Sequence, residues 1–513
     1  MDRAPAPAHL LLIAACAWLP ACGLNQAGVS PPNDTIAYPA SAIMDSQGDW
    51  LFVTNSNADL RYNDGTLTTF SLERARADRG GPPQATGLTA WPSCPQVDYS
   101  NPRSDDIQHN RCCWDALDNN VLNCDERWYV GADGDEGNGS GNVRIGSFAA
   151  GMTLQKVACP TNCPNCGATP TDDRLLLGVR GDTSLTFIDV QSVDASTPPL
   201  LKCINGSSGS VDFDTCDKDH RIVQATTALA APMPGAEPPA VPLPDEPYAL
   251  AIDPSNGLLY IGHLTGTTAR AYSGGFSLFD IAPQGGGPLA PPRFVAPFPP
   301  PFPPNSVGSV GITALNTFTN SYGQTAVYAS SRFVPQVSGL GTTATCPDNP
   351  VREIAAFPNG STYASPLFGA ETRGIQFIEG QDRAFVLQRT PPTLIGFVAS
   401  TAAATDTLET CGSPTFLDQH KNSAGQVRLF VTCFADGEIY VFDPAVPTLI
   451  KQFSVGRGPS GLVFDDSMDP NSRHVAYVVG FGDNNVSVID LTPGSRTEYH
   501  VVQRIGFPRT SPR

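Results

Sequence analysis

The chain has 513 residues and a formal net charge of −18 at pH 7. Nucleic acid is not expected as a partner, because the sequence has no basic patch to neutralise phosphates. Charged residues make up only 16% of the chain, whereas glycine and proline number 48 and 49. This composition is typical of many short strands joined by turns, and the length suits one large domain or two ordinary ones.

The N-terminal residues 1–21 predict an export signal. A short segment with Arg3 leads into an apolar run over 10–19, which is too short to cross a bilayer as a helix. The string L-P-A-C that ends at Cys22 resembles the lipobox of bacterial lipoproteins, which implies that Cys22 is acylated and becomes the first mature residue. A second such string ends at Cys16 but leaves a shorter apolar run, and an ordinary cleaved signal is the other alternative.

The cysteines fit an exported chain, because paired cysteines become disulfides outside the cytosol. With Cys16 lost in the signal and Cys22 lipidated, an even number remains, as a disulfide set requires. The C-x3-C-x2-C spacing at 159–166 also suits an iron–sulfur cluster or zinc, but such clusters belong to a reducing cytosol, so we favour disulfides. The candidates are Cys94, Cys112, Cys113, Cys124, Cys159, Cys163, Cys166, Cys203, Cys216, Cys346, Cys411 and Cys433.

Units of four short strands recur along the chain. The last unit is the clearest, and its strands are expected at 456–464, 474–480, 484–491 and 499–506. Six further units begin near residues 40, 174, 247, 310, 373 and 414. Because a four-stranded sheet has two apolar faces to bury, the sequence predicts an all-β, seven-bladed β-propeller of antiparallel blades rather than a β-sandwich. Residues 34–38 are a candidate outer strand of the last blade.

Two strings indicate a family. F-V-T-N at 52–55 and V-S-V-I-D at 486–490 match the strand consensus of the YVTN-type, lactonase-like β-propeller repeats, which the units resemble. The resemblance covers about 39–506 and implies the propeller fold. Most units lack the complete Gly-Pro turn of that family, so the function of the family transfers poorly.

Polar residues at strand ends have two interpretations. An aspartate ends the third strand of several units, and its side chain is expected to form a turn by accepting backbone N–H groups. A catalytic or metal role is disfavoured, because equivalent positions lie far apart around a ring. These residues are Asp189, Asp280, Asp443 and Asp490. His263 follows the second strand of its unit and either faces the axial funnel or is a polar strand end.

Three insertions interrupt the units, at 74–142, 194–246 and 282–306. The first has little hydrophobic periodicity, so disulfides are expected to replace a core there. The other two carry proline-rich runs, which are expected to be surface straps or docking segments. A loop in the first insertion has the oxygen ligands of a calcium site, although a solvated loop is the alternative. The candidate ligands are Asp133, Asp135, Glu136, Asn138 and Asn142.

Two disulfide pairings follow from position. Cys203 and Cys216 bracket a short polar segment that resembles a hairpin. Cys411 precedes the first strand of its unit and Cys433 ends the second. Antiparallel pairing brings the latter two together, so a bond between them is the most specific prediction.

The expected organisation is a signal over 1–21, a lipidated linker over 22–38, a single propeller over 39–506 and a tail over 507–513. The protein is expected on the bacterial outer membrane, held by its lipid, where it acts as a binding scaffold that presents its loops and central funnel to an envelope protein, a glycan or a small ligand. The alternative is a propeller enzyme, a lactonase-like hydrolase or a quinone- or metal-dependent oxidoreductase, with its site in the axial funnel. No catalytic residues are predicted and calcium is the one cofactor considered. Apolar innermost strands favour binding.

Overall fold

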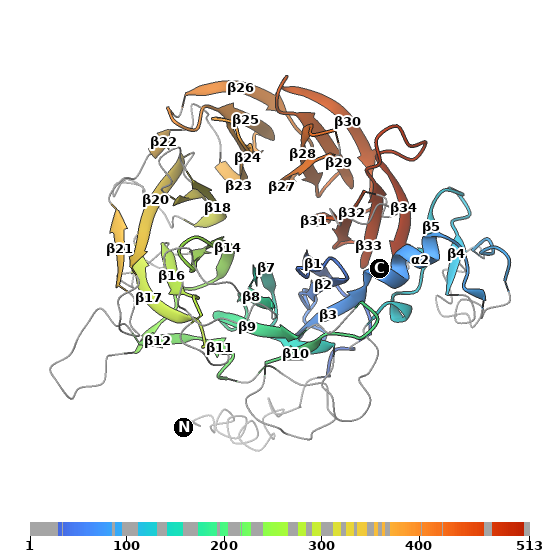
Figure 1. The fold of residues 1–513 in the computed structure, drawn as a ribbon, viewed down its shortest axis with the longest axis horizontal. Helices are drawn as coiled ribbons and strands as arrows, with labels where there is room; N and C mark the ends of the chain where they lie inside the picture. The colour runs from blue at the N-terminus through green and yellow to red at the C-terminus, as the bar shows by residue number, and fades with distance from the viewer. Residues whose placement is uncertain are drawn as a thin grey trace, which may run out of the picture.

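The protein forms a ring of seven blades (Figure 1). Among the described residues, none of the helices is long and apolar enough to span a bilayer. The computed structural model describes residues 29–32, 34–84, 88–94, 111–130, 141–156, 173–191, 195–203, 216, 218–226, 240–264, 275–283, 290–298, 311–319, 325–332, 336–345, 353–357, 362–364, 370–401, 403–422, 424–465 and 474–506.

Each blade is an antiparallel sheet, with its strands in chain order from the axis outward. Blades 1 to 3 consist of β1 (Pro39–Met44), β2 (Trp50–Asn55), β3 (Gly65–Ser71) and β6 (Asn142–Ile145); of β7 (Ala149–Lys156), β8 (Asp173–Val179), β9 (Ser184–Gln191) and β10 (Leu200–Lys202); and of β14 (Pro247–Asp253), β15 (Leu258–His263), β16 (Phe276–Asp280) and β17 (Arg293–Phe298). Three short strands lie outside these paths, namely β11 (Arg221–Ile222), which pairs with β9, and the separate pair β12 (Gln224–Thr226) and β13 (Ala240–Pro242).

The remaining blades follow the same plan. Blades 4 and 5 consist of β18 (Ile312–Thr319), β19 (Thr325–Ser331), β20 (Gln336–Thr345) and β21 (Glu353–Phe357), with β22 (Thr362–Ala364) also pairing with β20; and of β23 (Ala370–Phe377), β24 (Ala384–Thr390), β25 (Thr393–Phe397) and β26 (Ala404–Glu409). Blades 6 and 7 consist of β27 (Pro414–Lys421), β28 (Val427–Cys433), β29 (Glu438–Asp443) and β30 (Thr448–Ser454); and of β31 (Pro459–Asp465), β32 (Val475–Gly480), β33 (Asn485–Asp490) and β34 (His500–Ile505). The predicted all-β, seven-bladed propeller is therefore confirmed.

The apolar core lies between neighbouring blades, because each sheet is covered on both faces. Between blades 1 and 2, Trp50 and Phe52 of β2 pack in one cluster with Leu175 and Leu177 of β8. All four side chains are fully buried, and each contributes about 1.5–3 kcal/mol by leaving water. The second strands are buried on both faces, which is why they consist of runs of β-branched, leucine and aromatic residues.

Aspartates close hairpins at the ends of inner strands. Asp253 ends β14, and its carboxylate accepts the backbone N–H groups of Ser255 and Asn256 at 3.0 and 3.3 Å. Gly257 then adopts a left-handed conformation with φ of 62°, which glycine tolerates without steric strain. The carboxylate of Asp45, directly after β1, accepts the backbone N–H groups of Asp49 and Trp50, at the end of the turn and the start of β2. Local turn chemistry therefore fixes the register of these hairpins.

The first strand of every blade carries a β-bulge near its start. Its register against the second strand shifts by one residue in all seven blades. A bulge bends the strand and re-aims the extra side chain. We call these extra residues the bulge residues: Ala40, Ala150, Tyr248, Thr313, Arg373, Thr415 and Ser460.

The ring closes without an exchange of inner strands between the first and last blades (Figure 1). Ser460 of β31 donates its hydroxyl hydrogen to the carbonyl oxygen of Pro39 in β1, at 3.2 Å. The backbone N–H of Tyr38 donates to Asn484 Oδ1 at 2.6 Å. No strand forms at 34–38, so the outer strand considered for that segment was wrong.

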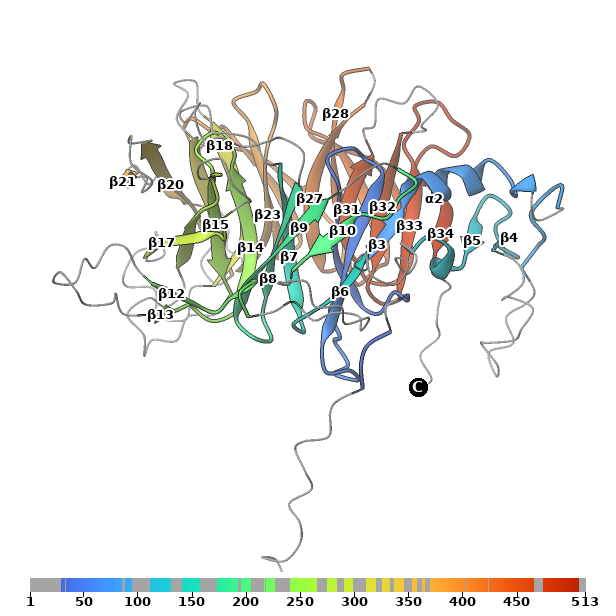
Figure 2. The same ribbon diagram turned by 60° about the horizontal axis from the view of Figure 1, so that its bottom comes forward.

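A hairpin from the first insertion reinforces this closure. After β3 the chain forms α2 (Leu72–Arg79), then β4 (Cys112–Trp114), β5 (Leu122–Cys124) and the 3-10 helix η2 (Glu126–Trp128). β5 pairs in parallel with β34 and β4 lies outside it, so both strands extend the outer edge of blade 7 (Figure 2). We call β4 and β5 the clasp, because they join a segment of blade 1 to blade 7.

The first insertion has an apolar core, contrary to the expectation that disulfides replace one. Ala75, Trp91 and Tyr129 are buried in the cluster between blades 1 and 7. The bonds Cys94–Cys113 and Cys112–Cys124 add covalent links within the clasp region. The prediction failed because these apolar residues contact distant blades rather than one another in a periodic pattern.

The other two predicted insertions contain strands of the ring itself. β10 and β17 are the outermost of the four strands in blades 2 and 3, yet they lie within 194–246 and 282–306. β17 includes Pro297, which an outermost strand tolerates because its outward side needs no backbone donor. Proline-rich composition therefore concealed two edge strands.

The structure contains both disulfides predicted from position, Cys203–Cys216 and Cys411–Cys433. The Cα atoms of the second pair lie 5.6 Å apart, which is an ordinary separation for a disulfide. The three cysteines of the C-x3-C-x2-C string and one further candidate lie outside the described residues, namely Cys159, Cys163, Cys166 and Cys346.

Candidate functional site

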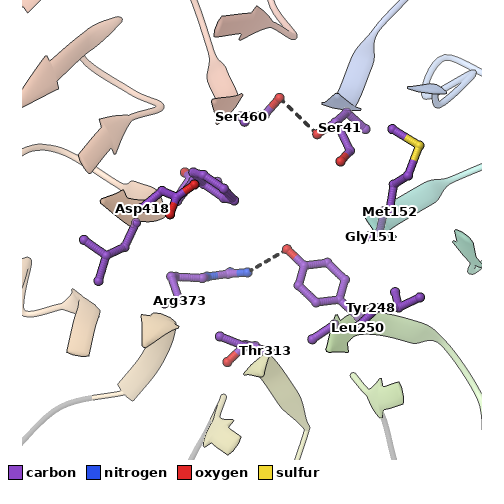
Figure 3. A pocket seen from close by; sticks show the side chains of 18 of the residues that line it. Ser41, Gly151, Met152, Tyr248, Leu250, Thr313, Arg373, Asp418 and Ser460 are labelled. Carbon is purple, nitrogen blue, oxygen red and sulfur yellow. Dashed lines mark hydrogen bonds between the residues drawn. The ribbon is translucent and has the colours of Figure 1, made fainter. Parts of the chain in front are cut away.

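A pocket of about 840 Å³ occupies the axis of the ring (Figure 3). Its volume falls in the range of roughly 300–1,000 Å³ that holds small organic molecules. The first strands of all seven blades contribute to its wall, and residues that follow several second strands complete it at one mouth. The lining runs over 40–42, 148–152, 248–250, 313–317, 373–377, 415–419 and 460–462, with Ser56, Ala58, Arg180, Phe434 and Phe481.

All seven bulge residues line this pocket, so the repeated bulge decides which side chains face the cavity. The hydroxyl groups of Thr313 and Thr415 are already engaged, since each donates to a backbone carbonyl of its neighbourhood. Tyr248 and Arg373 instead extend towards each other over the pocket (Figure 3). These two bulge residues offer the most adaptable polar groups of the ring.

Arg373 and Tyr248 bridge the pocket. Arg373 Nη1 of blade 5 lies 3.4 Å from the hydroxyl oxygen of Tyr248 in blade 3, so the pair passes in front of blade 4 (Figure 3). The Arg373 side chain is only 12% exposed, and its buried Nε–H has no acceptor among the described residues. Because a buried N–H without a hydrogen-bond acceptor is unfavourable, this guanidinium is suited to donate a hydrogen bond to a ligand.

Further arginines lie at the same mouth, at equivalent positions of different blades. Arg180 follows β8, Arg332 follows β19, and Arg389 lies near the end of β24. The side chains of Arg180, Arg332 and Arg389 are 32%, 33% and 32% exposed. With Arg373 they form what we call the cationic arc, on blades 2, 4 and 5.

Two glutamates partly neutralise the cationic arc. The Glu371 carboxylate is shared by Arg332, Arg373 and Arg389, at 3.5, 3.6 and 3.7 Å. Glu246 pairs with Arg180 at 3.0 Å. Among the described residues, these ion pairs set four positive charges against two negative ones, which is an excess of two positive charges. Both glutamates have left-handed backbone conformations and lie two residues before a bulge residue.

Aromatic side chains occupy the same positions on the opposite part of the mouth. Phe434 follows β28 and Phe481 follows β32, where blades 2 and 4 have arginines. Their ring centroids lie 6.0 Å apart, and the ring of Tyr38 lies 5.4 Å from that of Phe481. We call Tyr38, Phe434 and Phe481 the aromatic arc, on blades 6, 7 and 1. The mouth is therefore cationic on one side and aromatic on the other.

A row of polar side chains crosses blades 4, 5 and 6 at the pocket wall. Asn316 Nδ2 donates to Gln376 Oε1 at 2.6 Å, and Gln376 Nε2 donates to Asp418 Oδ1 at 2.6 Å. The backbone N–H of Gln419 also donates to Asp418 Oδ1, at 2.8 Å. Asp418 is the one acidic residue among the described lining, and these bonds fix the position of its carboxylate.

His263 does not reach the pocket. It ends β15, is fully buried, and its Nε2 lies 2.8 Å from the hydroxyl oxygen of Ser277. Burial lowers the pKa of this imidazole to about 4. The funnel-facing interpretation was therefore wrong, and the residue is a buried polar strand end.

Three of the four aspartates form the expected turns. Asp280, Asp443 and Asp490 end their strands, and each carboxylate accepts the backbone N–H two residues further on, at 3.1, 2.8 and 2.9 Å. Asp189 differs, because β9 continues to Gln191 and its carboxylate pairs with Arg174 at 2.5 Å instead. All four stay outside the pocket lining.

The calcium prediction falls almost wholly outside the described residues. Asp133, Asp135, Glu136 and Asn138 are not described. Asn142 begins β6, and its Oδ1 accepts the backbone N–H of Thr69 at 2.9 Å. Within the described ranges, no group of three or more His, Cys, Asp or Glu side chains is suited to a metal ion.

The cationic arc and the Arg373–Tyr248 pair were not predicted from the sequence. A signal was present, because superposing the units on their second strands aligns Arg180 with Arg332 and Arg389. The bulges gave no such signal, since no particular residue type marks them.

No family model matches the chain, and no curated protein matches it either. Solved structures with a similar fold include a protein from Lactobacillus plantarum, with a TM-score of 0.40, 15% identity, and coverage of 72% of this chain and 89% of that chain. A functionally unknown protein from Desulfotomaculum acetoxidans has a TM-score of 0.39 at 10% identity, with 73% and 94% covered. The dihydro-heme d1 dehydrogenase NirN in complex with DHE has a TM-score of 0.38 at 11% identity, with 76% and 61% covered. The likeness extends to the general fold and no further.

Proposed function

We propose that this protein is an exported, lipid-anchored β-propeller of the bacterial cell envelope that binds a small ligand in its axial pocket. The observation that carries the binding role is the composition of the pocket lining. Seven blades enclose one cavity, whose described wall is mostly apolar or small and carries two arginines, one tyrosine, one carboxylate and three side-chain amides. A mainly apolar cavity with few fixed polar groups is typical of ligand-binding sites.

The lining favours binding over the enzyme alternative. Lactonase-like hydrolysis or a quinone- or metal-dependent oxidation requires several acidic, basic or metal-binding groups that converge on one point. Among the described lining residues, Asp418 is the one acid, and none is a histidine or a cysteine. Asp418 is the single catalytic candidate of that alternative, and its bonds to Gln376 and Gln419 suit a structural role.

Native mass spectrometry of the protein purified from its own membranes tests whether it carries a bound small molecule. Ala150 is a bulge residue in the pocket wall, so Ala150→Trp fills the cavity. A small-molecule adduct is expected on the unmodified protein and not on this variant. Leu449→Trp is the matched control, because it adds the same ring on the outermost strand β30, where the side chain is 43% exposed. An adduct that survives Ala150→Trp, or that is absent throughout, contradicts the proposal.

The lipid anchor and the family are part of the same proposal. The lipobox-like string at Cys22 supports acylation, which would hold the protein on the outer membrane, on its periplasmic or surface side. Cys22→Ser is expected to abolish incorporation of labelled palmitate and to release the protein from the membrane fraction. F-V-T-N falls in β2 and V-S-V-I-D in β33, second and third strands of their blades, which supports membership of the YVTN-type family.

An envelope protein or glycan partner on the outer loops is the wider proposal. Cross-linking on intact membranes tests it, with a calcium-chelated sample as the control. A cross-link that disappears with chelation supports calcium in the loop at 131–142. A cross-link that resists chelation supports the partner and argues against calcium.

A further inference from the structure

The mouth of the pocket has the opposite charge to the rest of the chain. The sequence carries a net charge of −18, whereas the cationic arc and its two glutamates leave an excess of two positive charges. Charged groups in a partly closed cavity interact more strongly than in open water. A positive mouth on an acidic protein therefore points to a negatively charged ligand.

The guanidinium groups of Arg180 and Arg373 are not saturated by their partners among the described residues. Three arginines share the Glu371 carboxylate at 3.5–3.7 Å, whereas a tight charge-assisted bond measures about 2.7–2.9 Å. The buried Nε–H groups of Arg180 and Arg373 lack an acceptor among the described residues. Planar guanidinium groups match carboxylate and phosphate oxygens, so an anionic group of a ligand would supply the missing acceptors.

The aromatic arc adds a second requirement. Phe434 and Phe481 line the same pocket as Arg180 and Arg373, but on other blades. Met152 of blade 2 and Leu250 of blade 3 add further apolar side chains to the wall (Figure 3). An inorganic anion would leave these surfaces without a contact, whereas an apolar body would cover them.

We propose that the pocket binds an organic anion with an apolar body, whose anionic group lies at Arg373 and Arg180 and whose body lies against the aromatic arc. This inference rests on the proposed function, because it assigns a chemical class of ligand to the same cavity. Tyr248 is its positioning residue, since its hydroxyl oxygen holds the Arg373 guanidinium across the pocket at 3.4 Å.

Two fluorescent probes with the same aromatic body separate charge from apolar contact. 8-Anilinonaphthalene-1-sulfonate carries a negative charge, and N-phenyl-1-naphthylamine is neutral. Titration of the full chain is expected to give tighter binding of the sulfonate. Raising the ionic strength from about 0.01 M to about 1 M shortens the Debye length from about 30 to about 3 Å, so the sulfonate is expected to lose affinity while the neutral probe does not.

Variants then test whether the positive charge of Arg373 binds the sulfonate group. Arg373→Gln is expected to weaken sulfonate binding about tenfold to a hundredfold, the usual effect of one hydrogen bond to a charged group, and to leave the neutral probe unchanged. Arg373→Lys keeps the charge but loses the planar fork, so an intermediate affinity is expected. Lys421→Gln is the matched control, because it removes one positive charge outside the pocket from a side chain that is 56% exposed.

The outcomes distinguish this inference from the proposed function. Equal binding of both probes, blocked in both cases by Ala150→Trp, overturns the anionic class and leaves ligand binding in the pocket standing. Sulfonate binding that Ala150→Trp does not affect overturns both. If Arg373→Gln fails to fold, as judged by circular dichroism, the dependence on ionic strength of the unmodified chain decides the matter, and affinity that salt does not change refutes the inference.

Discussion

The buried imidazole of His263 predicts a measurable loss of stability in acid. The pKa of histidine in an unfolded chain is about 6.5, and burial lowers the pKa of His263 to about 4. Between these two pH values, His263 binds a proton in the unfolded chain but stays neutral in the folded chain. The contribution of His263 to the free energy of unfolding is therefore complete above about pH 6.5 and falls as the pH drops towards 4. The difference of about 2.5 pKa units corresponds to about 3 kcal/mol in total, of which about 2.5 kcal/mol is lost by about pH 4.5.

His263→Gln isolates this effect, because glutamine keeps a polar group near Ser277 and does not titrate. The measured quantity is the free energy of unfolding in urea for both proteins, at about pH 7.5 and about pH 4.5. Carboxylates contribute equally to both proteins, so they cancel in the difference between them. The unmodified protein is expected to lose about 2.5 kcal/mol more than the variant. Equal losses, or an imidazole pKa near 6.5 in an NMR titration, would refute the reasoning.

Three further changes test the architecture. Replacing Cys411 and Cys433 by alanine opens a link between residues 22 apart and is expected to lower stability by about 3 kcal/mol in urea, whereas an unchanged midpoint would mean that the bond constrains nothing. Gly374→Ala places a Cβ 2.7 Å from that of Leu417, so a loss of about 1–3 kcal/mol is expected in the same assay, and a neutral result would show that blades 5 and 6 can separate there. Leu122→Ala empties a buried clasp position and is expected to lower stability by about 2–5 kcal/mol and to speed amide hydrogen exchange in β34, and protection that stays unchanged would argue against the clasp.

The ring could be predicted from the sequence because its determinants are local. Each unit alternates or clusters β-branched and aromatic residues between turn formers, as in Val486 to Asp490, and the seven copies add up to one architecture. The turn role of Asp443 and the Cys411–Cys433 bond followed from the same strand order. These predictions needed no contact between distant parts of the chain.

The clasp and the pocket chemistry could not be predicted in the same way. β4 and β5 have three residues each, which is too short to show a periodic pattern. They extend a sheet only because β5 pairs with β34 from the other end of the chain. Arg373 and Tyr248 face the axis because a bulge turns them there, and a bulge is a property of the paired backbone. The apolar strings next to them dominated the sequence pattern, so the pocket was expected to be more apolar than it is.

At the mouth of the pocket, the residue after the second strand makes the same backbone hydrogen bond in most blades, but its side chain differs between blades. In six blades, the backbone N–H of the residue after the second strand donates to the carbonyl oxygen of the residue before the bulged strand, at 2.7–3.3 Å. Arginine occupies this position in blades 2 and 4 and phenylalanine in blades 6 and 7, on the same backbone frame. Because the backbone bond does not depend on the side chain, a single substitution at Arg180 or Phe434 is expected to change the chemistry of the mouth and to leave the ring intact. The division into a cationic and an aromatic arc is therefore a feature that the fold does not require, and the proposed ligand binding would account for it.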